Sequence, residues 1–375
     1  MNIITILEKY KNIILLLLIS VVITAVIHIM INRNGGSDNP TGCNRCPGSD
    51  VSYKIYKDWK GIDLQPEKNR GWKYYDQPCG GTFGIGNDPT HGAVCYGKYP
   101  ELFTEKDNDR LRIDVQHDFE ENKRDGCCKQ RKSIRLSTEE QYNDGLFIIS
   151  ASHIPAGHGV WPSFWLSAVE PDGNKWACHG EIDIIEGVNS VDPETSINAS
   201  TLHTNEINGT KCIQDGVPGV SNGGDCQAGN PHWKTCGCDN KSMCPTLGCG
   251  VHLENKKSFG QGFNENGGGV YVCELTKEGK VTIWFFEKDE VPCDITCNKP
   301  DPSKWSDKNT IKFKSCPGHF QNLELILNTT LCGDWAGSEG AFKLPGTNCL
   351  DYVWNPANLL EEAYWDINFV KIFKK

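Results

Sequence analysis

The sequence has little positive charge and lacks the loops that bind nucleotides. It carries 38 lysines and arginines against 48 aspartates and glutamates, a formal net charge of -10. Because nucleic-acid binding requires a basic patch that offsets the phosphates, this balance excludes nucleic acid as an expected partner. The glycine-rich stretch 80–86 is not followed by Gly-Lys-Ser/Thr, so a phosphate-binding loop is excluded as well.

Helical periodicity is scarce beyond Tyr53, and short alternating strands take its place. Strands are expected at 110–116, 134–136, 146–149, 271–275, 281–286, 323–327 and 365–369. Turn signals such as Asn143-Asp144-Gly145 separate them. Many short strands between turns predict an all-β sandwich rather than a fold of alternating strands and helices.

One long hydrophobic run lies near the N-terminus. Residues 13–31 are almost uninterruptedly apolar, which is enough to span a bilayer, and no small-residue cleavage site follows. The head, 1–12, carries two lysines against a single nearby Arg33 beyond the run, so the positive-inside rule leaves the head in the cytosol. The sequence predicts a single-pass signal anchor, with a lipid bilayer as partner and the rest of the chain extracytoplasmic, at the cell surface or in the secretory pathway.

All 19 cysteines lie beyond this run, which fits an oxidising compartment with several disulfides. The odd number leaves at least one thiol unpaired or intermolecular. A linker at 32–50 holds Cys43 and Cys46, for which a disulfide is favoured over a redox or zinc pair, because no second pair follows at finger spacing. The cysteines within 236–249 suggest zinc as an alternative, but the compartment favours disulfides there too.

Three carboxylates stand close together in the stretch Gly-Glu-Ile-Asp-Ile-Ile-Glu-Gly. The isoleucines favour extended backbone, whereas like charges on one sheet face repel and cost stability. In a regular strand Glu181 and Asp183 share a face, and Glu186 lies on the other. One extra residue, inserted as a β-bulge near Ile184 and Ile185, returns Glu186 to the face of the other acids and buries both isoleucines. We predict that bulge.

Three acids on one face cannot all ionise freely, so their pKa values are pushed apart and titrate as a coupled set. Glycoside hydrolysis needs this arrangement, since one carboxylate stays charged to attack or stabilise the sugar while a second keeps a proton for the leaving oxygen. An acidic, solvated edge strand is the alternative interpretation of these residues alone.

Further motifs accompany this stretch along most of the chain. They lie at 88–92, 159–166, 201–204, 262–269, 284–286, 330–337 and 363–366. With them, the chain resembles glycoside hydrolase family 16, specifically its fungal-type, laminarinase-like endo-1,3(4)-β-glucanases. The resemblance implies a concanavalin-like jelly roll over 51–375 whose concave sheet binds β-glucan polysaccharide. It also implies endo-acting, retaining hydrolysis of β-1,3 and mixed β-1,3/1,4 glucans through a covalent glycosyl-enzyme.

The resemblance also assigns residue roles. Glu181 matches the nucleophile, Asp183 the carboxylate that orients it, and Glu186 the acid/base, while His203 lies where relatives place a histidine near the acid/base. Three tryptophans match aromatics that flank the sugar: Trp165, Trp176 and Trp335. A structural role for His203 is the alternative. The chemistry requires no metal or other cofactor; some relatives hold a structural calcium ion, for which this sequence shows no ligand set.

Some features depart from this pattern or leave alternatives open. His179 stands where relatives often have glycine, and the loops from Cys212 to Cys249 are unusually rich in cysteine. For Trp161 a core position is one alternative, and Trp165 and Trp176 are favoured before it as sugar-binding residues. A wall-remodelling transglycosylase would keep all three acids, whereas a non-catalytic β-glucan-binding protein would typically have lost a glutamate.

Four N-x-S/T sequons lie at Asn198, Asn208, Asn240 and Asn328. Because Asn198 and Asn328 fall within expected strands, an unmodified, buried asparagine is an equal interpretation there. Asn328 is also close in sequence to Trp335 and serves the cleft in that alternative.

Overall fold

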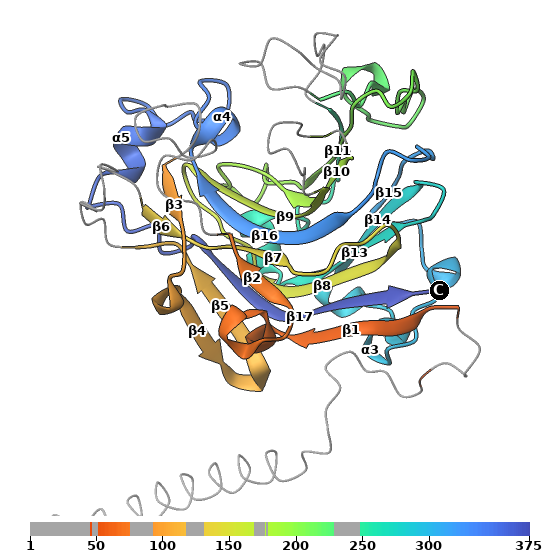
Figure 1. Cartoon of the computed structure of the whole chain (residues 1–375). Coiled ribbons are helices and arrows are strands. Elements are labelled where there is room, and N and C mark those ends of the chain that lie inside the picture. Colours follow the sequence, from red (N-terminus) through yellow and green to blue (C-terminus); the bar gives the residue numbers. More distant parts are fainter. Residues whose placement is uncertain are drawn as a thin grey trace, which may run out of the picture. The chain divides into compact units, whose positions relative to one another are not determined.

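Two antiparallel sheets pack face to face and enclose the main hydrophobic core (Figure 1). The computed structural model describes residues 46, 52–75, 93–117, 131–168, 177, 179–228 and 248–375. The chain divides into two compact units, Met1–Arg45 and Cys46–Lys375, and the described residues all belong to the second.

Several sequence predictions fall outside the described residues: the head at 1–12, the anchor at 13–31, most of the linker at 32–50, Trp176 and Asn240. The predicted domain boundaries and the anchor therefore stay predictions. None of the helices in the described ranges has the length and hydropathy that a bilayer crossing requires.

The larger sheet has eight strands in the order β15-β14-β13-β8-β17-β5-β4, with β1 also paired to β17. Their bounds are β1 Lys54–Lys60, β4 Phe103–Lys106, β5 Arg110–Asp114, β8 Gly145–His153, β13 Gly269–Leu275, β14 Val281–Glu287, β15 Thr310–Lys312 and β17 Tyr364–Lys374. The predicted hairpin is confirmed, because β13 and β14 pair antiparallel along their whole length.

The second sheet has seven strands in the order β12-β11-β10-β9-β16-β7-β2. Their bounds are β2 Trp72–Tyr74, β7 Arg135–Thr138, β9 Val160–Ala168, β10 Glu181–Glu186, β11 Ala199–His203, β12 Cys249–His252 and β16 Leu323–Leu331. Since β8 and β9 are consecutive in sequence but belong to opposite sheets, the predicted all-β sandwich is confirmed.

The remaining elements are short. They are the parallel pair β3 Val94–Tyr96 and β6 Arg131–Ser133, the α-helices α2 Gly260–Glu265, α3 Cys293–Thr296, α4 Gly333–Ala336 and α5 Cys349–Val353, and the 3₁₀ turns η1 Gly61–Leu64, η2 Pro66–Lys68, η3 Pro100–Leu102, η4 Asp107–Asp109, η5 Asn222–Gly224, η6 Lys288–Glu290 and η7 Pro302–Lys304.

The outer face of the eight-stranded sheet carries a second hydrophobic cluster. Its largest members are Trp284, Phe286 and Trp305, all buried. The segment 288–308, which contains α3, covers this face, and Ile295 of α3 is fully buried there. The part of this sheet around β8, β13 and β14 is therefore enclosed on both sides, although antiparallel sheets can leave one side in water.

Disulfides predicted from the cysteine content are confirmed among the described residues. The bridges are Cys46–Cys297, Cys212–Cys316, Cys226–Cys249 and Cys332–Cys349. Cys46 does not close a small loop with Cys43; it reaches a residue 251 positions away, beside α3. The unpaired thiol that the odd count requires is represented by Cys273, which is buried in the core.

Candidate active site

The acidic strand β10 contains the predicted bulge. Against β9, Asp183 lies opposite Trp165 and Ile185 lies opposite Phe164, so Ile184 has no partner of its own. Ile184 and Ile185 are both fully buried in the core. The prediction is confirmed, because the register shift occurs at the residue needed to turn the following glutamate outward.

The three acids therefore share the outer face of the seven-stranded sheet. Glu181 lies opposite Ser167 of β9, and Glu186 lies opposite Ser163 on the same strand. Glu181 is only 6% exposed and Asp183 only 2%. The solvated edge strand that the sequence left open is wrong, because β10 is an interior strand with β9 and β11 on its two sides.

Burial sets the proton affinities of this cluster. It raises the pKa of Asp183 to about 8. The pKa of Glu186 is also raised well above the ordinary glutamate value, first by burial and then by the charge of Asp183. The cluster therefore retains a proton near neutral pH, and Glu186 is suited to be a proton donor.

His203 ends the neighbouring strand β11 and faces the same cluster. Its Nε2 lies 3.0 Å from Asp183 Oδ2 and 3.9 Å from Glu181 Oε1. The resemblance had associated this histidine with the acid/base, but these contacts join it to the other two acids. Gly248 packs behind the ring: its φ is +89°, and a Cβ there would lie 2.5 Å from His203 Nδ1.

Glu181, Asp183 and His203 are also close enough to share a metal ion, since one ligand atom from each lies within 4.8 Å of the others. Calcium takes six to eight oxygen ligands, so two carboxylates and an imidazole do not fit it. The sequence prediction that catalysis needs no metal stays a prediction.

Trp161 contacts Glu186 directly. Its indole Nε1 donates to Glu186 Oε1 at 2.9 Å, and its ring meets Trp335 of α4 edge-to-face with centroids 5.8 Å apart. The core position that the sequence left open for Trp161 is wrong, because its side chain contacts Glu186 on the outer face of the sheet. The period of two was the missed signal, because residues 161 and 165 of one regular strand share a face.

Trp165 belongs to a second aromatic group on the same face. Its Nε1 donates to Asn328 Oδ1 at 2.7 Å, and the guanidinium of Arg135 lies 4.9 Å from its ring and 4.2 Å from that of Tyr75. Asn328 is 7% exposed and also donates to the Tyr96 hydroxyl at 3.2 Å. Asn328 thus faces this surface, as one interpretation of its sequon proposed, while sequence reasoning missed Arg135 and Tyr75.

A cavity of about 720 Å³ lies beyond the C-terminal end of β10. Trp335 and Gly187 line it on the side of Glu186, and Val191, Ile197 and Phe259 are among its apolar walls. Its volume is that of a site for a small organic ligand. Trp335 thus lies between Trp161 and this cavity.

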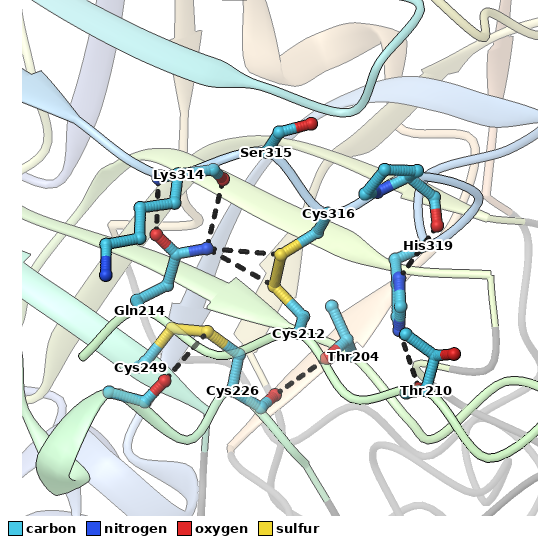
Figure 2. The surroundings of a disulfide bond; sticks show 12 residues. Thr204, Thr210, Cys212, Gln214, Cys226, Cys249, Lys314, Ser315, Cys316 and His319 are labelled. Atoms are coloured by element: carbon cyan, nitrogen blue, oxygen red, sulfur yellow. Dashed lines mark hydrogen bonds between the residues drawn. A yellow bond between two sulfur atoms is a disulfide. The ribbon is translucent and has the colours of Figure 1, made fainter.

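The described part of the cysteine-rich loop after β11, residues 204–228, is tied by disulfides to Cys249 of β12 and to Cys316. Figure 2 shows the Cys212–Cys316 bridge close to the Cys226–Cys249 bridge. The Gln214 amide lies 3.1 Å from the sulfur of Cys316. The two described ends of the loop therefore border the site as predicted, because Cys249 opens β12 and pairs with the residue before His203.

Comparisons with known proteins agree with the family resemblance of the sequence. Residues 82–373 match a family model described as "XgeA-like, catalytic GH16 domain". A probable glycosidase of Schizosaccharomyces pombe is 32% identical over 86% of this chain and 70% of its own length. A probable endo-1,3(4)-β-glucanase of Aspergillus niger is 32% identical over 88% of this chain, which spans 41% of that relative.

Two solved structures share the fold with a TM-score of 0.65 and 28% identity, each over 86% of this chain. One is laminarinase 16A of Phanerochaete chrysosporium with β-glucans in its donor and acceptor sites, matched over 99% of its length. The other is an elongating β-1,3-glucosyltransferase, matched over its full length.

Proposed function

The chain belongs to glycoside hydrolase family 16, and we propose that its β10 cluster hydrolyses β-1,3 and mixed β-1,3/1,4 glucans such as laminarin. The names of the Aspergillus relatives and the glucans bound by the Phanerochaete laminarinase support this substrate class. In this proposal cleavage is internal to the glucan chain and retains anomeric configuration.

The reaction proceeds in two displacements. Glu181 attacks the anomeric carbon and forms a glycosyl ester, while Glu186 gives its proton to the departing glycosidic oxygen. The Glu186 carboxylate then takes a proton from water, whose oxygen displaces Glu181 and releases the sugar. Asp183 lies between them in sequence on the same face and keeps the cluster partly protonated.

The observation that carries the proposal is the shared face of Glu181 and Glu186, which the bulge creates. Both acids face outward from the sheet, and aromatic side chains of β9 and α4 lie beside them. Tryptophan faces are apolar surfaces with a donor at one edge, which suits stacking on sugar rings.

Reducing-sugar release from laminarin and from mixed-linkage glucan tests the proposal. Glu181→Gln is expected to lose at least about three orders of magnitude in kcat, because no nucleophile remains. Glu274→Gln is the matched control, since Glu274 lies on β13 of the other sheet, where it accepts from the Tyr53 hydroxyl. Wild-type protein that binds laminarin without cleaving it or changing its chain lengths would instead be a glucan receptor.

Transglycosylation is the second candidate, and the likeness to the elongating glucosyltransferase favours it. Both reactions share the glycosyl-enzyme and differ in whether water or a sugar hydroxyl accepts the glycosyl group. Product analysis separates them, because hydrolysis increases the number of reducing ends whereas transfer redistributes chain lengths at constant number.

We also propose that residues 13–31 anchor the enzyme in a bilayer with its catalytic domain outside the cytosol. The length of the apolar run and the disulfides of the domain support this topology. Protease added to intact cells is expected to digest the domain, and alkaline carbonate is expected to leave the protein in the membrane fraction. Release of a soluble protein that begins after residue 31 would contradict the anchor.

A further inference from the structure

We propose that Asn198 is a positioning residue for Glu186: its side-chain amide holds the bulge of β10 and thereby aims the proton donor at the face of the nucleophile. The inference rests on the proposed function for the roles of the two glutamates. Asn198 precedes β11 and lies 12 residues from Glu186 in sequence.

The backbone ladder between β10 and β11 ends where the bulge begins. The paired residues are Glu181 with His203, Ile182 with Leu202, and Asp183 with Thr201. Past Asp183, no backbone group of β11 pairs with β10. The carbonyl of the bulged residue and the amide of the acid/base would then lack partners on this side of the strand, and buried backbone groups seldom remain unpaired.

The Asn198 side chain fills this gap in the ladder. Its Oδ1 accepts from Glu186 N at 3.0 Å, and its Nδ2 donates to Ile184 O at 3.0 Å. Ser200 Oγ donates to the same carbonyl at 3.0 Å. A carboxamide carries one acceptor and a donor pair, so it replaces a peptide unit of the missing strand, which neither an apolar side chain nor a carboxylate can do.

Asn198 is itself rigidly held. Its backbone N–H donates to Ser258 Oγ at 2.9 Å, and its carbonyl accepts from Leu253 N at 2.9 Å. Asn198, Ser200 and Ser258 are all fully buried. The bulge is therefore braced from a fixed point, and the direction of Glu186 follows from that point rather than from β10 alone.

This role also decides between the two interpretations of the Asn198 sequon. A glycan attached to Nδ2 would need a path to solvent from a site with 0% exposure and would replace a donor used by Ile184 O. The folded, active enzyme therefore carries an unmodified Asn198.

The test compares two substrates, of which only one needs a general acid to protonate its leaving group. In Asn198→Ala the full-length protein is expected to lose about 100-fold in kcat/KM on laminarin, the lower range of general-acid catalysis. Formation of the glycosyl-enzyme from dinitrophenyl β-laminaribioside, whose leaving group departs without a proton, stays within a few-fold of wild type. Equal losses on both substrates would overturn the inference and make Asn198 a purely structural residue.

Asn264→Ala is the matched control. Asn264 braces a backbone in the same way, accepting from Ile154 N at 2.8 Å and donating to Ile154 O at 3.0 Å, but at the end of the other sheet. Asn264→Ala is expected to change the rates on both substrates by the same factor. Should Asn198→Ala not fold, Ser200→Ala removes one donor from Ile184 O and is expected to show the same selective loss at smaller size.

A titration that needs no activity keeps the inference separate from the proposed function. The carboxyl of Glu186, labelled with carbon-13 and assigned with Glu186→Gln, is followed in wild type and in Asn198→Ala. Release of the bulge is expected to let Glu186 turn to solvent and lower its pKa toward the ordinary value of about 4.3. An unchanged pKa would overturn the positioning role even if wild type proved inactive on every glucan.

Discussion

The two sheets of the sandwich are both built from alternating strands, but their outer faces have different roles. Around β8, β13 and β14, the outer face of the eight-stranded sheet is covered by segment 288–308 and filled with aromatic and aliphatic side chains. The outer face of the seven-stranded sheet instead carries buried acids, indoles and amides, among them Glu181, Asp183 and Asn328. The first face contributes burial, and the second gives up stability for chemistry.

Buried carboxylates on the two faces make the contrast concrete. Asp294 of α3 accepts from Trp305 Nε1 at 2.8 Å and from Asp301 N at 2.9 Å, so its buried carboxyl group has hydrogen-bond partners. Asp183 is buried with a raised pKa, and Oδ2, which faces His203, makes no well-aligned hydrogen bond. Donors that satisfy an acid stabilise a fold, whereas a buried acid with a raised pKa keeps the cluster around it partly protonated.

Removing an aromatic residue from each face should separate stability from activity. Trp305→Ala is expected to cost about 3–5 kcal/mol, because it opens a cavity and leaves Asp294 without its indole donor. Thermal unfolding should then occur roughly 10 °C lower. Laminarin hydrolysis per folded molecule at low temperature should be unchanged.

The partner variant, Trp335→Ala, should show the reverse: little change in melting temperature and weaker glucan binding, measured by KM. Loss of activity in folded Trp305→Ala would mean that the two faces are not separable.

Asp183→Asn should sharpen the comparison by making the catalytic face more stable. The folded pKa of about 8 exceeds the unfolded value of about 3.9, so the folded state binds more protons between these values. The stability that Asp183 contributes is therefore full below pH 4 and is lost as pH rises toward 8. Asparagine cannot ionise, so at pH 7.5 the variant should melt roughly 2–6 °C higher, with hardly any difference near pH 4.

Glu287→Gln on β14 should change the stability of the fold at pH 7.5 in the opposite direction. Burial alone would raise the pKa of Glu287, but hydrogen bonds from Lys257 and Asn255 lower it below its ordinary value. This acid therefore stabilises the fold above its unfolded pKa, and that contribution is lost as pH falls. Its replacement should destabilise the protein at pH 7.5. If both variants changed the melting temperature in the same direction at both pH values, this account would be contradicted.

Features that depend on neighbours in sequence were predictable. The bulge followed from three acids and three isoleucines in one strand, since no regular register turns all the acids outward and all the isoleucines inward. The alternating strands at 110–116 and 323–327 were equally visible, because a strand with one apolar face has a period of two.

Features that depend on distant segments were not predictable. The sequence showed Asn198 only as a sequon or a buried asparagine. Its contact with Glu186 arises where the β10–β11 ladder ends, and the sequence does not reveal that position. The Arg135 stack needs strands that only the sheet brings together. Trp161 stayed undecided between core and cleft, because the sequence does not show which face of its strand lies outward.

The smallest expected effect concerns that same tryptophan. The hydrogen bond from Trp161 lowers the pKa of Glu186 against the stronger effect of burial, so Trp161→Phe should raise this pKa further. A general acid with a higher pKa stays protonated to higher pH, and the basic limb of kcat/KM on laminarin should move upward by less than about one pH unit. Trp165→Phe is the control, since the Trp165 indole donates to Asn328 and not to a carboxylate. The basic limb of the pH profile of this variant should stay in place. A downward shift in Trp161→Phe, or an equal shift in both variants, would show that the indole N–H does not tune the acid.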